Sequence, residues 1–149
     1  FRMSSASIKK IISCNKKNLI DIVLDIEKYP VFVPWCLDAK IHEKKVSKDF
    51  IEIKADLRVG KKFINELYSS LVLYSKKNNI ITVTNIDGPL EYLKNEWKFK
   101  EINNKTQLEF SIDFELKNNF LNLIIKNSFN VGLNKIAKSF EDRALELFK

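Results

Sequence analysis

The spacing of hydrophobic residues changes twice along the chain, and these changes mark its expected elements. Residues 6–12 have the pattern of a short strand. After Asn15, whose side chain can cap a helix, apolar residues recur at helical spacing, namely Leu19, Ile22, Val23 and Ile26. Because the residue before a proline avoids helical geometry, we expect this helix to end at Pro30, and the segment 29–36 to hold one short helical turn.

Between residues 37 and 116 the hydrophobic period becomes two, which is typical of half-buried strands. The clearest run alternates charged residues with Ile51, Ile53, Ala55, Leu57 and Val59. A further strand is predicted from the spacing of Phe63, Leu67, Leu71 and Leu73. Turn-forming residues separate the runs at 47–49, 76–79, 87–89 and 103–105. Strands joined by such short turns predict an antiparallel meander.

The last segment, residues 119–148, returns to helical spacing and predicts one long amphipathic helix. Its apolar stripe consists of Ile125, Phe129, Leu133, Ile136, Phe140, Ala144 and Leu147. We expect an α+β fold in which a curved antiparallel sheet wraps around this helix, with two short helices after the first strand. Gly132 lies inside the helix, where glycine costs about 1 kcal/mol relative to alanine. It indicates either close packing of the helix on the sheet or room for a ligand.

Composition adds little to this picture except a positive charge. The chain has 149 residues, a net charge of +7 and a pI near 9.3, and we expect a single domain over residues 3–149. A basic surface favours nucleic acid or anionic lipid headgroups, although the lysines are spread along the chain. Cys14 and Cys36 form no C-x-x-C motif, which favours reduced thiols and an intracellular protein. No apolar stretch reaches the roughly 20 residues of a membrane span.

The sequence carries little that indicates catalysis. His42 is the one histidine, it occupies an outward position of a predicted strand, and we interpret it as a solvated side chain. No cysteine, histidine or carboxylate stands at metal-ligand spacing around it, and the phosphate-binding and dinucleotide-binding glycine motifs do not occur. We therefore predict no catalytic residues, no metal site and no enzymatic activity.

Four blocks of residues resemble one protein family. Residues 25–36 read D-I-E-K-Y-P-V-F-V-P-W-C and resemble the signature of the Coq10/RatA family. Residues 87–99 are similar to its D-G-P block with a following tryptophan, residues 109–115 to its next strand, and residues 140–144 to its F-x-x-R-A motif. The blocks occur in the family's order over nearly the whole chain.

This resemblance implies a START-like, polyketide cyclase-like helix-grip fold and a coenzyme Q-binding domain. It implies ubiquinone as the bound ligand, with no other cofactor, and a role as carrier or chaperone of a polyprenyl quinone in respiration. RatA-type relatives imply an alternative, a toxin that binds the large ribosomal subunit. Such sequences tend to have glycine where this chain has Trp35, so the Coq10 function fits slightly better. The chain departs from Coq10-like sequences at Leu90, usually phenylalanine, and at Ser70, often arginine or lysine.

From the resemblance, together with the hydrophobic pattern, we expect a hydrophobic quinone site between the long helix and the sheet. Its predicted residues are Phe32, Trp35, Phe63, Leu67, Trp97, Phe99, Phe110, Phe114, Phe129 and Leu133. Phe32, Pro34 and Trp35 form its mouth or, equally, a rigid corner of the fold. The expected partners are a polyprenyl quinone and an anionic membrane surface, with the ribosome as the alternative. The expected location is the bacterial cytoplasm or inner-membrane surface, or the matrix side of a mitochondrial membrane.

Overall fold

The computed structural model describes residues 4–148, except for the side chains of residues 124 and 127. Its elements are β1 (Ser4–Ile12), α1 (Lys16–Leu24), the 3₁₀ turn η1 (Ile26–Lys28), α2 (Tyr29–Phe32), β2 (Cys36–Val46), β3 (Phe50–Lys61), β4 (Ile64–Ser75), β5 (Ile80–Asp87), β6 (Leu90–Ile102), β7 (Lys105–Leu116) and α3 (Asn119–Leu147). Six consecutive strands followed by one long helix confirm the predicted change of period.

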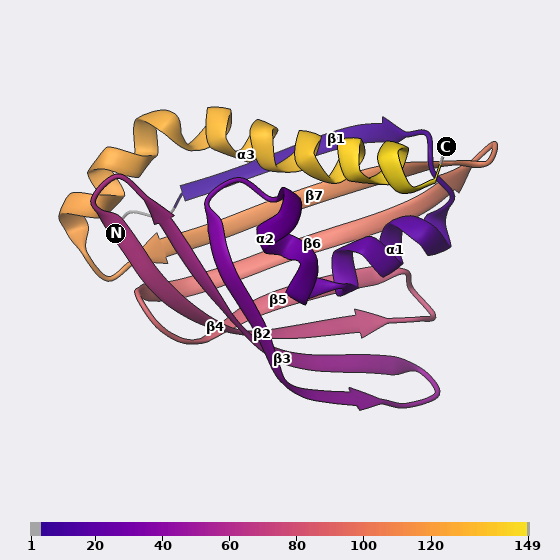
Figure 1. Ribbon diagram of the computed structural model, residues 1–149, viewed down its shortest axis with the longest axis horizontal. Helices are drawn as coiled ribbons and strands as arrows, with labels where there is room; N and C mark the ends of the chain where they lie inside the picture. Colours follow the sequence, from indigo (N-terminus) through magenta and orange to yellow (C-terminus); the bar gives the residue numbers. More distant parts are fainter. Residues whose placement is uncertain (1–3, 149) are drawn as a thin grey trace.

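The strands form one antiparallel seven-stranded sheet in the order β1-β7-β6-β5-β4-β3-β2. Strands β2 to β7 follow each other as a meander, and β1 returns to pair with β7. The long helix α3 runs across the sheet, and α1 and α2 lie beside it (Figure 1). The predicted α+β helix-grip arrangement is confirmed.

The first helix begins where the sequence predicts and ends earlier. The side chain of Asn15 accepts a hydrogen bond from the backbone N–H of Asn18 at 2.8 Å, as expected of a helix cap. The helix α1 stops at Leu24, and Pro30 lies in the first turn of α2. The prediction that Pro30 ends the first helix is therefore wrong. A proline needs no backbone N–H in a first turn, so Pro30 begins a helix here.

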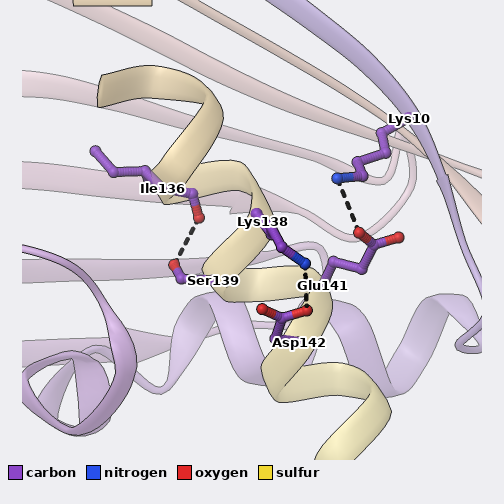
Figure 2. A network of polar contacts seen from close by, with 6 residues as sticks. All are labelled: Lys10, Ile136, Lys138, Ser139, Glu141 and Asp142. Atoms are coloured by element: carbon purple, nitrogen blue, oxygen red, sulfur yellow. Dashed lines mark hydrogen bonds and ion pairs between the residues drawn. The ribbon is translucent and has the colours of Figure 1, made fainter. Parts of the chain in front are cut away.

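The C-terminal half of α3 is firmly attached to the sheet and to the segment before β2. Lys10 of β1 forms an ion pair with Glu141 at 2.8 Å, while Lys138 and Asp142 pair on the outer side of the helix at 3.1 Å (Figure 2). Phe140 and Ala144 are fully buried beneath this half of the helix. These contacts hold the end of the helix nearest α1 in place.

Three of the blocks that carry the family resemblance meet in one aromatic cluster. The ring of Phe140 contacts the rings of Tyr29, Phe32 and Trp97 edge-on, with centroids 4.9 to 5.4 Å apart. Tyr29 also donates a hydrogen bond to the carbonyl oxygen of Val23, and the Arg143 guanidinium lies over the Phe32 ring. Edge-to-face rings add about 0.5–1.5 kcal/mol per pair beyond their buried area. These signature residues therefore fasten α2 to α3.

The thiols of Cys14 and Cys36 are both free, and burial raises the pKa of each above its usual value. Within residues 4–148, no helix has both the length and the hydropathy that crossing a bilayer requires.

Candidate ligand-binding site

The hydrophobic interior between α3 and the sheet consists of two clusters, which share Val83, Ile112 and Phe129 as partly buried neighbours. The larger cluster surrounds α1 and contains side chains with no exposure at all, among them Ile12, Leu19, Ile53 and Ile81. The smaller cluster is built on four buried residues, Leu90, Leu93, Phe114 and Leu116. Around it the hydrophobic neighbours are only partly buried, namely Tyr68, Val83, Ile112, Leu121, Ile125 and Phe129.

Partial exposure at the second cluster is informative because of where its residues lie. Val83 and Ile112 point inward from β5 and β7, which both have a neighbouring strand on each side. The edge of the sheet therefore cannot account for their exposure. Leu121, Ile125 and Phe129 of α3 pack on the same cluster and are also incompletely covered. Solvent thus reaches the inner face of the sheet at this end, and we take this end as the candidate site.

Two asparagines on the inner side are fully engaged in holding the strands. Asn95 donates to the carbonyl oxygen of Ser111 at 2.8 Å and accepts from the indole N–H of Trp97 at 2.7 Å. Asn85 accepts from the backbone N–H of Leu93 and donates to the carbonyl oxygen of Leu90, at 3.2 and 3.3 Å. These amides satisfy neighbouring groups, so they have a structural role.

Two hydroxyl groups on the same face have no such partner. Tyr68 and Ser70 lie two residues apart on β4, with side chains on the inner face. Among the residues that the structure describes, neither hydroxyl has a hydrogen-bond partner. Burial, assisted by the nearby charge of Glu66, raises the pKa of the Tyr68 phenol above its usual value. The phenol is therefore a proton donor throughout the physiological pH range.

Trp35 joins three segments of the chain near the part of α3 that carries Phe129. Its carbonyl oxygen accepts a hydrogen bond from Gly60 at 3.0 Å, and the Lys61 ammonium lies 4.9 Å from the ring centroid. The ring itself rests on Gly132 of α3, 3.5 Å from where a Cβ would stand. Gly132 thus allows close packing, which was one of the two interpretations of this glycine. Its packing partner is the loop before β2 rather than the sheet.

The structure distributes the predicted site residues over several environments. Phe114 and Phe129 lie together at the candidate site with ring centroids 4.9 Å apart. Leu133 is buried in the larger cluster, and Trp35 lies against Gly132 of α3. The packed aromatic core contains Phe32, Trp97 and Phe110. Phe99 is buried towards the β5 end of that core, where its backbone N–H bonds to Asn79.

Two predicted site residues do not face the interior. Leu67 is 44% exposed and shares the outer face of β4 with Leu71 and Leu73, opposite to the buried Ser70 and Val72. Phe63 is 71% exposed in the turn between β3 and β4. Both predictions of an interior position are therefore wrong. The cause is an inverted pattern, because β4 has leucines outside and polar side chains inside.

The residues that sequence reasoning missed are inner-face positions of ordinary appearance. They are Tyr68, Ser70, Val83, Ile112, Leu121 and Ile125. One signal was present for β4. Val72 and Ser70 have the same parity as Tyr68, and the register pairs them with Ile53, Ala55 and Leu57 of β3, whose inner face the sequence had already defined.

His42 lies on the outer face, as predicted, and it forms an ion pair with Asp56. Their Nε2 and Oδ2 atoms are 2.6 Å apart, and Ser69 donates to the other carboxylate oxygen at 2.6 Å. The hydrogen bond from Ser69, followed by that from His42, lowers the pKa of Asp56 below its usual value. The group faces away from the candidate site and stabilises the outer surface of β2, β3 and β4.

A curved antiparallel sheet that grips a long helix, with an accessible apolar interior at one end, defines the START-like class of proteins. Solved structures agree. An 18 kDa protein of Caulobacter crescentus has a TM-score of 0.80 at 27% identity, covering 97% of each chain. The Zhui aromatase/cyclase of a Streptomyces species has a TM-score of 0.83 at 12% identity, covering 99% of this chain and 96% of its own, and shares the fold.

The chain belongs to the family described as polyketide cyclase / dehydrase and lipid transport, whose model matches residues 19–141. The Rickettsia prowazekii protein named ribosome association toxin RatA is 35% identical over 99% of this chain and 100% of its own length. The mitochondrial protein of Dictyostelium discoideum named coenzyme Q-binding protein COQ10 is 33% identical over 85% of this chain, which spans 62% of that relative.

Proposed function

We propose that this chain binds a polyprenyl quinone, ubiquinone, and acts as its carrier or chaperone rather than as an enzyme. The observation that carries the proposal is the incomplete burial of inward-facing apolar residues on central strands, at Val83 and Ile112. An apolar ligand placed there removes this surface from water. This burial stabilises the complex by about 25 cal/mol per Å² of apolar area. A relative named for coenzyme Q binding and a family described by lipid transport support the choice of ligand.

Ligand exchange with a membrane requires a surface that touches lipid, and the hairpin between β3 and β4 offers one. Phe63 at its turn is 71% exposed and follows Lys61 and Lys62 directly. Exposed Leu37 lies against Gly60 at the base of this hairpin, and Lys61 contacts Trp35. An aromatic ring among cations suits the interface of an anionic bilayer. We therefore assign peripheral membrane contact to this turn.

The quinone proposal is tested by extracting the purified chain with organic solvent and analysing the extract by mass spectrometry. Ubiquinone in the extract, at a substantial fraction of the protein, is the expected result. A titration gives the affinity. The chain has two tryptophans, Trp35 and Trp97, so Trp97→Phe leaves Trp35, which rests on Gly132 of α3, as the one indole. Added quinone should quench its fluorescence to saturation, and the absence of both signals would exclude this function.

Association with the ribosome is the second candidate, because the relative that matches over its whole length is named for it. The net charge of +7 gives such binding an electrostatic basis. Sedimentation of the chain with ribosomal subunits at low and high salt tests the idea. Stoichiometric binding to the large subunit that weakens steeply with salt favours this function. Equal sedimentation of Lys61→Ala, Lys62→Ala and the unmodified chain would show that the hairpin takes no part in it.

A further inference from the structure

The inner face of the sheet has one largely buried polar side chain that makes no hydrogen bond to the described residues and whose hydroxyl is still accessible to solvent. Within the described residues, the buried polar side chains are Ser70, Asn95, Thr106 and Asn122. Asn95 bonds to Ser111 and Trp97, Thr106 bonds to Cys14, and Asn122 bonds to both backbone groups of Leu116. Ser70, only 7% exposed, has no bonding partner in this part of the chain. No fully buried side-chain oxygen or nitrogen among the described residues lacks a partner, so the small exposed fraction of Ser70 includes its hydroxyl, which is accessible to a ligand.

The surroundings of Ser70 show that its hydroxyl belongs to the candidate site. It lies across from Ala55 on β3 and Asn85 on β5, at the point where a bulge interrupts the pairing of β4 with β5. Ala55 is small, and the amide of Asn85 is bonded to β6. The other hydroxyl that makes no hydrogen bond is that of Tyr68, which lies two residues before Ser70 on the same face of β4. The site therefore presents two neutral hydroxyl groups from alternate residues of β4.

We propose that the hydroxyls of Tyr68 and Ser70 form the head-group subsite and donate hydrogen bonds to the carbonyl oxygens of the bound quinone. This inference rests on the proposed function and names the polar contacts within it. An oxidised quinone has only acceptors on its ring, and neutral hydroxyls can satisfy them. None of the buried side chains in the described part of the chain is charged. The site therefore favours a neutral lipid head group. A carboxylate or a phosphate would lose its hydration there without meeting a counter-charge.

The test compares quinone binding by the full chain and by Tyr68→Phe and Ser70→Ala, which each remove one hydroxyl. The probe is a ubiquinone with a ten-carbon saturated tail, and the signal is quenching of tryptophan fluorescence. Loss of one hydrogen bond to a neutral acceptor weakens binding by about 5- to 10-fold. We expect this loss in each variant. The dissociation constant of squalene, a hydrocarbon without a ring head, obtained from its displacement of the probe, should remain unchanged in every variant.

Matched controls come from the exposed surface. Tyr92→Phe and Ser7→Ala delete equivalent hydroxyls on exposed side chains, and both should bind the probe as the unmodified chain does. The carbonyl stretching band of the bound quinone should lie at lower frequency than in hydrocarbon solvent and should move back in Tyr68→Phe. Equal affinity in both site variants, or tighter binding of decanoate than of the quinone, would overturn the subsite. Failure of the unmodified chain to bind quinone, while squalene still binds, would overturn the proposed function and the subsite together.

Discussion

The indole ring of Trp35 lies on the backbone of Gly132, with its Cζ3 and Cη2 atoms 3.5 Å from the position that a Cβ would occupy. This distance is ordinary van der Waals contact, so a methyl group fits without displacing the ring. Because alanine is better than glycine in a helix interior by about 1 kcal/mol, Gly132→Ala should stabilise the fold by about 0.5–1 kcal/mol. Thermal unfolding should show a melting temperature higher by a few degrees.

Gly88→Ala is the contrasting variant for that experiment. Gly88 has a φ of 124°, and an added Cβ would meet the carbonyl oxygen of Leu67 at 2.7 Å. We expect this substitution to destabilise the fold, since alanine does not adopt that conformation without strain. A lower melting temperature for Gly132→Ala would show that Trp35 packs more tightly than the distance indicates.

A second prediction concerns Thr106, which is fully buried and donates a hydrogen bond to the carbonyl oxygen of Cys14 at 2.7 Å. Thr106→Val keeps the shape of the side chain and leaves that buried carbonyl without its donor. The expected loss of unfolding free energy is about 1–3 kcal/mol, measured by urea denaturation. Thr106→Ser retains the hydroxyl and removes one methyl group, so it should cost about 0.8 kcal/mol. If Thr106→Val lowers the unfolding free energy less than Thr106→Ser does, the hydrogen bond contributes little to stability.

The third prediction is a dependence of stability on pH through Asp56. Hydrogen bonds from Ser69 and His42 depress its pKa in the folded chain, so the unfolded chain binds a proton more readily. Its contribution is therefore present above the usual pKa of 3.8 and is lost as the pH falls below that value. Asp56→Asn should be less stable than the unmodified chain by about 1 kcal/mol at pH 7.

Urea titrations at a series of pH values measure that difference. The gap in unfolding free energy between the two proteins should narrow as the pH falls below about 3.8. Ser69→Ala should reproduce part of the gap, because the hydrogen bond from Ser69 is the largest cause of the lowered pKa. A gap that stays constant down to pH 2.5 would mean that the charge of Asp56 is not the stabilising feature.

The fourth prediction tests the membrane-contacting turn. Phe63→Ser should weaken binding to vesicles that contain anionic phospholipid by about tenfold, because a phenylalanine ring contributes roughly 1.5–3 kcal/mol when it leaves water. Phe50→Ser is the matched control, since Phe50 is 44% exposed at the opposite end of β3. Co-sedimentation with vesicles gives both affinities. Equal loss in the two variants would point to general surface hydrophobicity rather than to contact through this turn.

The elements of this fold follow from local chemistry that the sequence displays openly. Asn15 caps α1 as its side chain predicts, and the alternation from Ile51 to Val59 places the inner face of β3 correctly. These sequence patterns predict the elements correctly because an amphipathic helix or strand must bury its apolar side in any fold.

The face of β4 could not be predicted, since two effects there act against the usual pattern. Its outer leucines lie beside long charged side chains, with Leu71 opposite Lys54 and Leu73 opposite Glu52, whose aliphatic stems cover apolar surface. Its inner face carries Tyr68 and Ser70, which are polar at the candidate site. A binding site is where the rule that interiors are apolar is expected to fail.

The backbone of Trp35 has a φ of 65°, a left-handed conformation that favours glycine. A glycine at this position would keep the bend before β2 and would remove the ring that rests on Gly132. One base separates the tryptophan codon from a glycine codon, so a single mutation can remove the ring from α3 while the backbone bend before β2 is kept. This contact between the loop and the helix is therefore easily lost or gained in evolution without a change of fold.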